Sequence, residues 1–300
     1  MARRRSPQLQ DRLRKPAADP LRPTDGSTVS VPQMDTAVVT GGGRGLGLAI
    51  ARRLAARGLA VLITDLDGEA AEGAARSVGG SAWSAPLDVR DPDGCRAVAA
   101  EASARGRLSV WVNNAGVLFS GPAWGQADAE VELTVAVNVL GVMHGSRAAL
   151  GEMADGGRIL NVASLSALGL APGLAVYGAT KHAVLAFATS LAADLHAAGR
   201  GIEVRTLCPD VIDTRMVRDQ LDSPDAAILW SGPAPLAVED VADRALALLD
   251  GRRPRAVMPA WRGELLRLLY RFPRLALPGL SLLGRLGTWR RTRWRRRMGA

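Results

Sequence analysis

Two side chains able to move a proton stand one helical turn apart, at Tyr177 and Lys181. They are four residues apart in a segment of helical character, so both lie on one face of the helix. A free phenol has a pKa of about 10, and a neighbouring ammonium group favours the phenolate that a base needs near neutral pH. Ser164, just after the apolar run that ends at Val162, offers a hydroxyl to a substrate oxygen. The alternatives are a surface pair and a serine in an ordinary turn.

A glycine-rich turn between the first predicted strand and the first predicted helix is the second chemical feature. Glycines let the backbone turn tightly and approach a pyrophosphate, while the start of the helix offers free N–H groups and a positive dipole. The spacing Gly-x-x-x-Gly-x-Gly differs from the Gly-x-Gly-x-x-Gly fingerprint, so a turn that binds nothing stays open. The residues expected to contact a cofactor here are Thr40, Gly41, Gly43, Arg44, Gly45, Leu46 and Gly47.

Asp65 bears on which dinucleotide would bind. It ends the second predicted strand, eighteen residues after Gly47, where a carboxylate can accept hydrogen bonds from the adenosine ribose hydroxyls. The same charge repels a 2′-phosphate. Arg44 argues the other way, because a guanidinium beside the turn can pair with a 2′-phosphate, although it can also point to solvent. We expect NAD as the preferred cofactor, with NADP as the alternative.

The elements that must position these residues alternate between short apolar runs and longer Ala/Leu-rich segments of helical period, as in β-α-β units. The predicted strands are Thr36–Thr40, Ala60–Asp65, Ser81–Leu87, Leu108–Asn113, Arg158–Val162, Ile202–Cys208 and a seventh at Arg255–Met258. The predicted helices are Gly45–Arg57, Asp67–Val78, one starting near Asp91, and long ones around 127–153 and 176–198. We predict an α/β fold with a doubly wound parallel sheet of about seven strands. It forms a single domain over 35–260, between a disordered leader (1–34) and a basic amphipathic extension (261–300).

The order and spacing of the motifs resemble the short-chain dehydrogenase/reductase family over about residues 35–250. The resemblance rests on the turn at 40–47, Asp88 after the third predicted strand, Asn113-Asn114-Ala115-Gly116 after the fourth, and then Asn138, Ser164 and Tyr177-x-x-x-Lys181. It implies a Rossmann-type, NAD(P)-dependent oxidoreductase that interconverts an alcohol and a ketone or aldehyde. The cofactor carries the hydride, so the protein needs only to place the substrate and move one proton, with Tyr177 as general acid/base. Lys181 can also hold the nicotinamide ribose.

The resemblance also implies roles for residues outside the turn and the Tyr/Lys pair. It places Asp88 and Val89 at the adenine, Asn114, Ala115 and Gly116 in the cofactor cleft, and Pro209, Ile212 and Thr214 near the nicotinamide, and it gives Asn138 a water that passes protons toward Lys181. Plainer alternatives stay open: Asp88 as a helix cap, residues 113–116 as an ordinary turn, and Asn138 as a satisfied helix asparagine. One departure is Pro209-Asp210, where the family usually has Pro-Gly. An aspartate adopts a positive φ less easily than glycine, and this one could also face the nicotinamide.

The net charge of +9 is concentrated at the ends of the chain. Residues 1–34 hold seven Lys/Arg against three Asp/Glu, and residues 252–300 hold fourteen Arg against one Glu, which leaves −8 for residues 35–251. A core of this sign repels phosphate backbones, so no nucleic-acid partner is expected. Two rival functions remain: a non-enzymatic nicotinamide sensor on the same fold, and nucleic-acid binding through the Arg-rich ends.

The C-terminal extension combines apolar and basic residues. Leu265, Leu268, Leu269 and Phe272 fall on one predicted helical face, which Pro273 should end, and Trp289–Arg297 holds six Arg with two Trp. This composition suits an anionic membrane surface, or alternatively a lid over the substrate cleft followed by a solvated tail. Both interpretations favour a lipophilic alcohol or carbonyl substrate. The expected substrate loop adds apolar residues at Met216, Ile228, Leu229 and Trp230.

Compartment and assembly follow from weaker signals. Cys95 and Cys208 are too few for a disulfide framework and have no metal-ligand spacing, so we expect a reducing cytoplasm and no metal site. The basic start lacks an apolar signal segment, and the apolar run 275–284 is about half of a spanning helix, so no transmembrane helix is predicted. The protein is therefore expected in the cytoplasm, with peripheral membrane contact through 261–300 as an option. Apolar faces on the helices holding Asn138 and Tyr177 favour a homo-oligomer, a dimer or tetramer.

Overall fold

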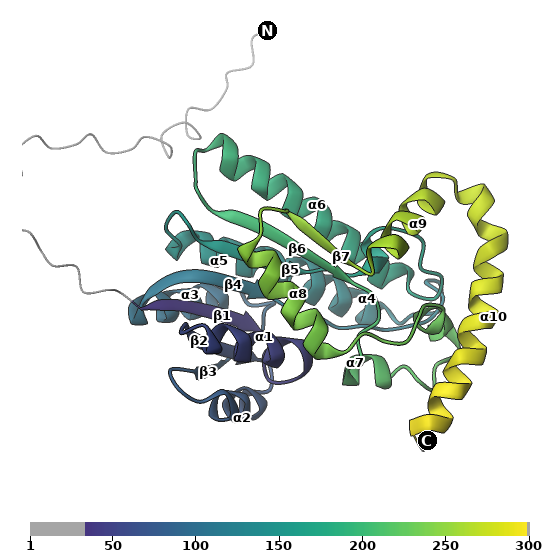
Figure 1. Ribbon diagram of the computed structural model, residues 1–300, viewed down its shortest axis with the longest axis horizontal. Coiled ribbons are helices and arrows are strands. Elements are labelled where there is room, and N and C mark those ends of the chain that lie inside the picture. The colour runs from purple at the N-terminus through teal and green to yellow at the C-terminus, as the bar shows by residue number, and fades with distance from the viewer. Residues whose placement is uncertain (1–33, 299–300) are drawn as a thin grey trace, which may run out of the picture. The chain divides into compact units, whose positions relative to one another are not determined.

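Seven parallel strands form the sheet that carries the site, in the order β3-β2-β1-β4-β5-β6-β7 (Figure 1). They are β1 (Asp35–Thr40), β2 (Ala60–Asp65), β3 (Trp83–Pro86), β4 (Arg107–Asn113), β5 (Arg158–Val162), β6 (Glu203–Pro209) and β7 (Arg255–Met258). The computed structural model describes residues 34–298, and the predicted leader lies outside them apart from Met34. The strand order reverses beside β1, where a crevice opens at the carboxyl ends of the strands. The predicted doubly wound parallel sheet is confirmed.

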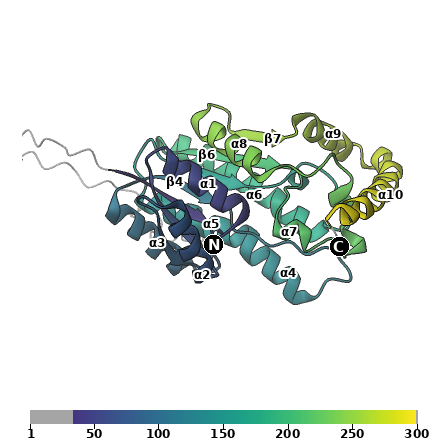
Figure 2. The same cartoon turned by 60° about the horizontal axis from the view of Figure 1, so that its bottom comes forward.

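Helices cover both faces of this sheet. One layer contains α1 (Gly45–Ala56), α2 (Gly68–Val78) and α8 (Val238–Asp250), and the other contains α3 (Pro92–Arg105), α5 (Val142–Glu152) and α6 (Ala175–Ala197). The central strands are apolar along their whole length because alternate side chains enter opposite layers. In β1, Val39 packs in the first core cluster and Val38 in the second. Figure 1 and Figure 2, two views related by a 60° turn, show the sheet between these layers.

The helix predicted around 127–153 is one continuous run of three parts. These are α4 (Asp128–Val135), a π-helical turn η3 (Ala136–Gly141) and α5. By length and composition the run Asp128–Glu152 is apolar enough to cross a membrane, and 44% of its most apolar window is buried inside the protein. This is weak evidence for a membrane span, because the core helix of a soluble protein meets the same criterion. The π turn matters for the site, since it carries Asn138.

The segment after β7 differs from the predicted amphipathic helix and tail. Helix α9 (Ala260–Arg271) ends before Pro273, as predicted, but Pro273 then begins a second helix, α10 (Pro273–Met298). Proline is tolerated in the first turn of a helix, so a proline that ends one helix can also start the next. The predicted apolar face of α9 is only partly buried. Leu265, Leu268 and Phe272 are exposed, whereas Leu266 packs against the core.

Candidate active site

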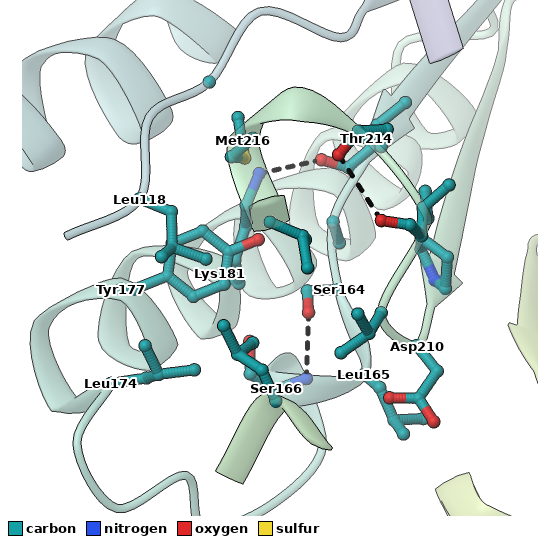
Figure 3. A pocket seen from close by; sticks show the side chains of 18 of the residues that line it. Leu118, Ser164, Leu165, Ser166, Leu174, Tyr177, Lys181, Asp210, Thr214 and Met216 are labelled. Atoms are coloured by element: carbon teal, nitrogen blue, oxygen red, sulfur yellow. Dashed lines mark hydrogen bonds between the residues drawn. The ribbon is translucent and has the colours of Figure 1, made fainter. Parts of the chain in front are cut away.

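One cavity of about 1360 Å³ lies at the carboxyl ends of the strands and contains most of the predicted site. Its walls come from the glycine-rich turn, the ends of β2 to β6, α6 and the C-terminal helices α9 and α10. The cofactor residues that line it are Gly41, Arg44, Gly45, Leu46, Asp65, Asp88, Val89, Asn114, Ala115, Gly116, Pro209, Ile212 and Thr214. Of the catalytic candidates, Ser164, Tyr177 and Lys181 also line it, and Figure 3 shows them in one part of the cavity. Four predicted site residues do not line the cavity, namely Thr40, Gly43, Gly47 and Asn138.

The glycine-rich turn has the geometry that a bound phosphate group requires. Gly41 and Gly45 have φ values of +61° and +54°, which disfavour other residues. A Cβ on Gly47 would lie 2.3 Å from the carbonyl oxygen of Gly41, so only glycine fits there. The start of α1 has no side-chain cap and no acidic residue in its first turn. No side chain therefore caps the first N–H groups of this helix, and this cradle fits a dinucleotide.

Asn114 ties this turn to the end of β4. Its side-chain amide donates to the carbonyl oxygens of Thr40 and Gly41, at 3.0 and 2.9 Å, and its backbone N–H donates to the Thr40 hydroxyl at 3.1 Å. The Thr40 hydroxyl donates in turn to the carbonyl oxygen of Val112 at 3.2 Å. The alternative of an ordinary turn at 113–116 is therefore wrong. Asn114 holds the two strands that flank the cofactor crevice.

Asp65 and Arg44 occupy the two sides of the predicted ribose site. One Asp65 carboxylate oxygen accepts a hydrogen bond from the Gly43 N–H at 3.0 Å, and the other accepts from the Asp67 N–H at 3.2 Å. Arg44 instead pairs with the side chain of Asp67 at 3.4 Å, and both of these side chains are about half exposed. The carboxylate is fixed by the backbone, whereas the guanidinium is held only by a surface ion pair. Asp65 is thus held by two backbone hydrogen bonds, whereas Arg44 forms a single ion pair at the surface.

Asp88 lies in the cavity wall after β3 and does not cap the next helix. Helix α3 is capped by Asp91, whose side chain accepts a hydrogen bond from the Asp93 N–H. The Asp88 carboxylate pairs with Arg90, whose Nε lies 2.9 Å from both carboxylate oxygens. Hydrogen bonds from Arg90 lower the pKa of Asp88, so this group is an anion at neutral pH. The helix-cap alternative for Asp88 is wrong.

Tyr177 and Lys181 lie one turn apart on α6, but the expected electrostatics differ. Lys181 Nζ donates to the carbonyl oxygen of Val162 at 3.0 Å and lies 5.6 Å from the centre of the Tyr177 ring. Burial raises the pKa of Tyr177 to about 12, against a smaller lowering by a hydrogen bond with Ser164. Burial also lowers the pKa of Lys181 to about 8. In this ligand-free site burial dominates both pKa values, and Lys181 Nζ is engaged by a carbonyl oxygen. That Lys181, together with a bound cofactor, favours the phenolate stays a prediction.

Asn138 is fully buried in the π turn and anchors the neighbouring backbone. Its amide oxygen accepts from the Val117 N–H at 2.9 Å, while its amide nitrogen donates to the Val117 carbonyl at 2.9 Å and to the Thr180 hydroxyl at 3.2 Å. Gly116 lies between this amide and Lys181. A Cβ on Gly116 would be 3.2 Å from Asn138 Oδ1 and 3.7 Å from Lys181 Nζ. Because Gly116 has no side chain, a small space is left open there, and Asn138 Oδ1 and Lys181 Nζ both border it.

Asp210 lines the cavity, but its carboxylate is paired with a residue of α9, and its backbone is not strained. No non-glycine residue between 34 and 298 has a positive φ. The carboxylate points away from Tyr177 and Lys181 (Figure 3) and pairs with Arg262 on α9. The two side chains are only 11% and 13% exposed. Burial raises the pKa of Asp210, while the charge of Arg262 opposes that rise. The Asp210 side chain, at the position where the family usually has glycine, thus anchors α9.

The apolar side of the cavity combines the substrate loop with the C-terminal helices. Met216, Ile228 and Leu229 line the cavity as predicted. Trp230 does not: it is buried and stacks on Trp294 of α10, with ring centres 5.0 Å apart. The additional apolar wall residues from α9 and α10 are Trp261, Leu265, Leu266, Leu269 and Leu286.

Two groups of supporting residues were missed from the sequence. Asn113 donates to Ser146 at 2.9 Å and to Asn161 at 2.8 Å, and it accepts from the Trp111 indole at 2.7 Å. This buried network joins β4, β5 and α5 behind the cavity. Arg262 was the second omission. Its signal was Asp210 itself, because an aspartate directly after a buried strand requires a cationic partner.

Comparisons with known proteins agree with this geometry. The family described as short chain dehydrogenase matches residues 35–225. A 1-deoxy-11-beta-hydroxypentalenate dehydrogenase of Streptomyces avermitilis is 35% identical over 220 residues, covering 70% of this chain and 79% of that protein. A cyclopentanol dehydrogenase of a Comamonas species is 37% identical over 205 residues, covering 66% and 81%.

A solved structure is similar over most of the fold. It is a short-chain dehydrogenase/reductase from Burkholderia phymatum in complex with NAD, with a TM-score of 0.71 and 26% identity, covering 81% of this chain and 95% of that one. The family match spans more than half of the chain and includes the glycine-rich turn, Ser164, Tyr177 and Lys181. This chain therefore belongs to the short-chain dehydrogenase/reductase family and is a nicotinamide-dependent oxidoreductase that acts on CH–OH groups.

Proposed function

We propose that this enzyme interconverts a lipophilic alcohol and its ketone or aldehyde, with Tyr177 as the general acid/base and NAD as the preferred cofactor. The observation that carries the proposal is the single cavity that joins the glycine cradle to Tyr177, Ser164 and Lys181. Its far side is lined by apolar residues of α9 and α10. The names of two relatives give hydroxypentalenate and cyclopentanol as their substrates. Both substrates are alcohols, which supports the substrate class.

Each catalytic side chain has a task that its position supports. A bound nicotinamide would supply or accept the hydride. The Ser164 hydroxyl, which accepts a hydrogen bond from the Ser166 N–H at 3.1 Å, is held in place to bind the substrate oxygen. Tyr177, with its pKa near 12, is protonated at neutral pH and suited to donate a proton to a carbonyl. Proton removal from an alcohol needs a lower pKa, to which the Ser164 hydrogen bond contributes.

Lys181 and Asn138 assist the proton transfer without contacting the substrate oxygen. With its pKa lowered to about 8, Lys181 is mostly protonated at neutral pH, and it is the cation nearest to the Tyr177 ring among the residues described. The same ammonium group would hold the nicotinamide ribose. We propose that a water beside Gly116 links Lys181 to Asn138, since the two side chains border the space that this glycine leaves open.

Asp65 supports the preference for NAD. Its carboxylate is held by the N–H groups of Gly43 and Asp67 at the end of β2, where it would accept bonds from ribose hydroxyls and repel a 2′-phosphate. Asn114, Asp88 and Thr214 line the same cavity at the phosphate, adenine and nicotinamide ends of the proposed cofactor site.

Assembly and location follow as further parts of the proposal. Val135 and Leu140 are exposed on the continuous helix 128–152, which supports a homo-oligomer that pairs along this helix and α6. Cys95 and Cys208 are both free and buried, which supports a reducing, cytoplasmic compartment. Exposed Trp, Tyr, Phe and Leu side chains on α9 and α10 support contact with an anionic membrane surface.

The central test replaces the proton-transfer group alone. We expect Tyr177→Phe to abolish NAD-dependent oxidation of medium-chain secondary alcohols, while NADH binding, followed by nicotinamide fluorescence, stays within about threefold of wild type. Phe187→Leu, on the same helix but outside the cavity lining, is the matched control. A Tyr177→Phe enzyme with unchanged turnover, or a loss of NADH binding that accounts for the lost activity, would overturn the assignment.

A further inference from the structure

Two arginines of the C-terminal helices meet one short segment at the apolar end of the cavity. Arg262 of α9 donates to the Ser231 hydroxyl at 2.8 Å, and Arg290 of α10 donates to the backbone carbonyls of Ser231 and Gly232. Both arginines line the cavity. Gly232 is required for this approach, because a Cβ there would overlap the guanidinium of Arg262.

The two guanidiniums are not equally neutralised. Arg262 forms a buried ion pair with Asp210, so its charge is already balanced. Arg290 has no carboxylate within ion-pair distance among the residues that the structure describes. Its Nη1 is used by the two carbonyls, whereas its Nε and Nη2 donate to no atom in that part of the chain. This Nε–Nη2 edge is the one with which a guanidinium binds a carboxylate through two parallel hydrogen bonds.

The position of Arg290 is fixed by how α10 packs. Gly287, one turn earlier, is buried against 3-10 helix η5 (Pro224–Trp230), where a Cβ would lie 2.0 Å from the Ala227 carbonyl oxygen. Trp294, one turn later, stacks on Trp230. Leu286 lines the same cavity beside Arg290. A half-buried cation is therefore held next to apolar wall residues, where partial desolvation strengthens its attraction for an anion.

The remaining charges near this end of the cavity do not offset it. Arg215 and Asp219 also line the cavity and pair with each other at 3.7 Å, so together they add no net charge. Asp210 is committed to Arg262. Lys181 lies at the catalytic end and adds a second positive charge rather than a negative one. The substrate side of the cavity is thus apolar with an excess of positive charge.

We propose that Arg290 binds a carboxylate of the substrate, so that the enzyme acts on hydroxy or keto acids with an apolar body between the reacting carbon and the acid group. The proposal rests on the proposed function, since it names the substrate class of the same site. An apolar body matches the leucine-lined wall, and the carboxylate matches the unneutralised guanidinium. Arg290 is a specificity-determining residue in this scheme and takes no part in proton or hydride transfer.

The first test uses substrates that differ only in charge. A series of (ω−1)-hydroxy fatty acids of six to twelve carbons is compared with the corresponding methyl esters, with NAD and below micellar concentrations. We expect kcat/KM for at least one chain length to be about tenfold or more higher for the acid than for its ester, as one charged hydrogen-bonded contact provides. Equal kcat/KM values for acid and ester at every length would overturn the proposal.

The second test changes the residue. Arg290→Gln should lower kcat/KM for the acid by about 10- to 100-fold, mainly through KM, and leave the ester within about threefold, because only binding is lost. Arg290→Lys keeps the charge but loses the edge that forms two parallel hydrogen bonds, so it should keep only part of the preference for the acid. Arg285→Gln, an exposed arginine on the same helix, is the matched control and should change neither. An equal fall for acid and ester in Arg290→Gln would mean that Arg290 only docks α10.

A binding measurement separates this proposal from the proposed function. Dodecanoate cannot be oxidised as an alcohol, so its affinity for the NADH-bound enzyme, measured by calorimetry, does not depend on turnover. We expect dodecanoate to bind more tightly than dodecanol to wild type, and this difference to disappear in Arg290→Gln. If no hydroxy acid or ester is turned over but the dodecanoate result holds, the proposed function fails and the anion site stands. If dodecanol binds as well as dodecanoate, the anion site fails.

Discussion

At the scale of single residues, burial moves the pKa values of the two central groups in opposite directions. The phenol of Tyr177 rises to about 12 and the ammonium of Lys181 falls to about 8. Both shifts disfavour charge, as expected for groups taken out of water. At neutral pH the site therefore holds a protonated phenol beside an ammonium group that is mostly charged, and a bound cofactor and substrate would meet a proton donor rather than a preformed phenolate.

The lowered pKa of Lys181 predicts a pH dependence of stability. Below about pH 8 the lysine is charged in both the folded and unfolded protein, so its burial cost is constant. Between about pH 8 and the ordinary lysine pKa of 10.5, the unfolded chain binds more protons at this position than the folded protein does. The contribution of Lys181 to the free energy of unfolding therefore rises with pH over this range. We expect wild type to gain stability relative to Lys181→Met over this range, measured by urea unfolding at pH 7.5, 9 and 10. A constant difference between the two proteins would contradict a buried, desolvated lysine.

Asp65 predicts the outcome of a cofactor exchange. Replacing the carboxylate by a hydroxyl in Asp65→Ser removes the repulsion of a 2′-phosphate and a charged acceptor for the ribose. We expect the ratio of kcat/KM for NAD to that for NADP to fall by about 10- to 100-fold, which corresponds to roughly 1.4 to 2.7 kcal/mol. Glu69→Ser serves as the control, since Glu69 is an exposed carboxylate on α2 outside the cavity lining. An unchanged ratio in Asp65→Ser would remove Asp65 from cofactor selection.

At the scale of elements, the site depends on contacts between segments distant in sequence. Asn114 after β4 holds the turn after β1, and Asn138 in the π turn holds the backbone at Val117. Asp210 after β6 holds α9 through Arg262. In each case a polar side chain at a strand end or helix turn satisfies backbone or charged groups that would otherwise be buried unpaired. These contacts make the cavity wall rigid before any ligand binds.

The Asp210–Arg262 pair predicts that removing one charge destabilises the protein more than removing both. Arg262→Met leaves a carboxylate nearly buried without a partner, so we expect a loss of about 2–4 kcal/mol in the free energy of unfolding. The double variant Asp210→Asn/Arg262→Met removes both charges and should recover at least half of that loss. Denaturant unfolding of wild type and the variants measures this coupling. If the double variant is as unstable as the sum of the two single ones, the pair does not anchor α9.

At the scale of the whole molecule, the C-terminal helices have two different surfaces. One surface packs on the core and lines the cavity with Leu266, Leu269 and Leu286. The other exposes large side chains: of the twelve exposed large hydrophobic residues described, six lie in this segment, and four of these do not line the cavity, namely Leu268, Tyr270, Phe272 and Trp289. The lid and membrane interpretations of this segment are therefore compatible. The inner surface can close the cavity while the outer surface contacts lipid.

The membrane proposal predicts a charge- and surface-dependent effect. Because α9 and α10 form part of the cavity wall, deleting 261–300 would also damage the site, so point substitutions are the better test. We expect wild type to co-sediment with vesicles of anionic phospholipid, and Leu268→Glu with Trp289→Ser to reduce the bound fraction by at least threefold without loss of turnover. Trp124→Ser, an exposed tryptophan far from this segment in sequence, is the control. No sedimentation of wild type with anionic vesicles would contradict the proposal.

The sequence by itself determined the strands and the order of the motifs. Ala60–Asp65 and Arg158–Val162 were predicted with their observed bounds, because a strand buried on both faces is a short apolar run with clear ends. The half-buried edge strand Arg255–Met258 was also predicted with its observed bounds. The glycine-rich turn and the Tyr177/Lys181 spacing are equally local, since their geometry depends only on neighbouring residues. Helix α8 was not singled out, and its place against α1 follows only from the assembled sheet.

Only the tertiary structure decided which side chains pair across the molecule and which are desolvated. Neither the partnership of Asp210 with Arg262, fifty-two residues later, nor that of Asn113 with Asn161 can be inferred from local spacing. The pKa shifts of Tyr177 and Lys181 depend on burial by many segments at once. For the same reason, only the structure shows that Leu266 of α9 packs against the core while Leu268 is exposed. The surface that a helix buries is set by the partner it meets, and the amphipathic pattern of α9 did not specify that partner.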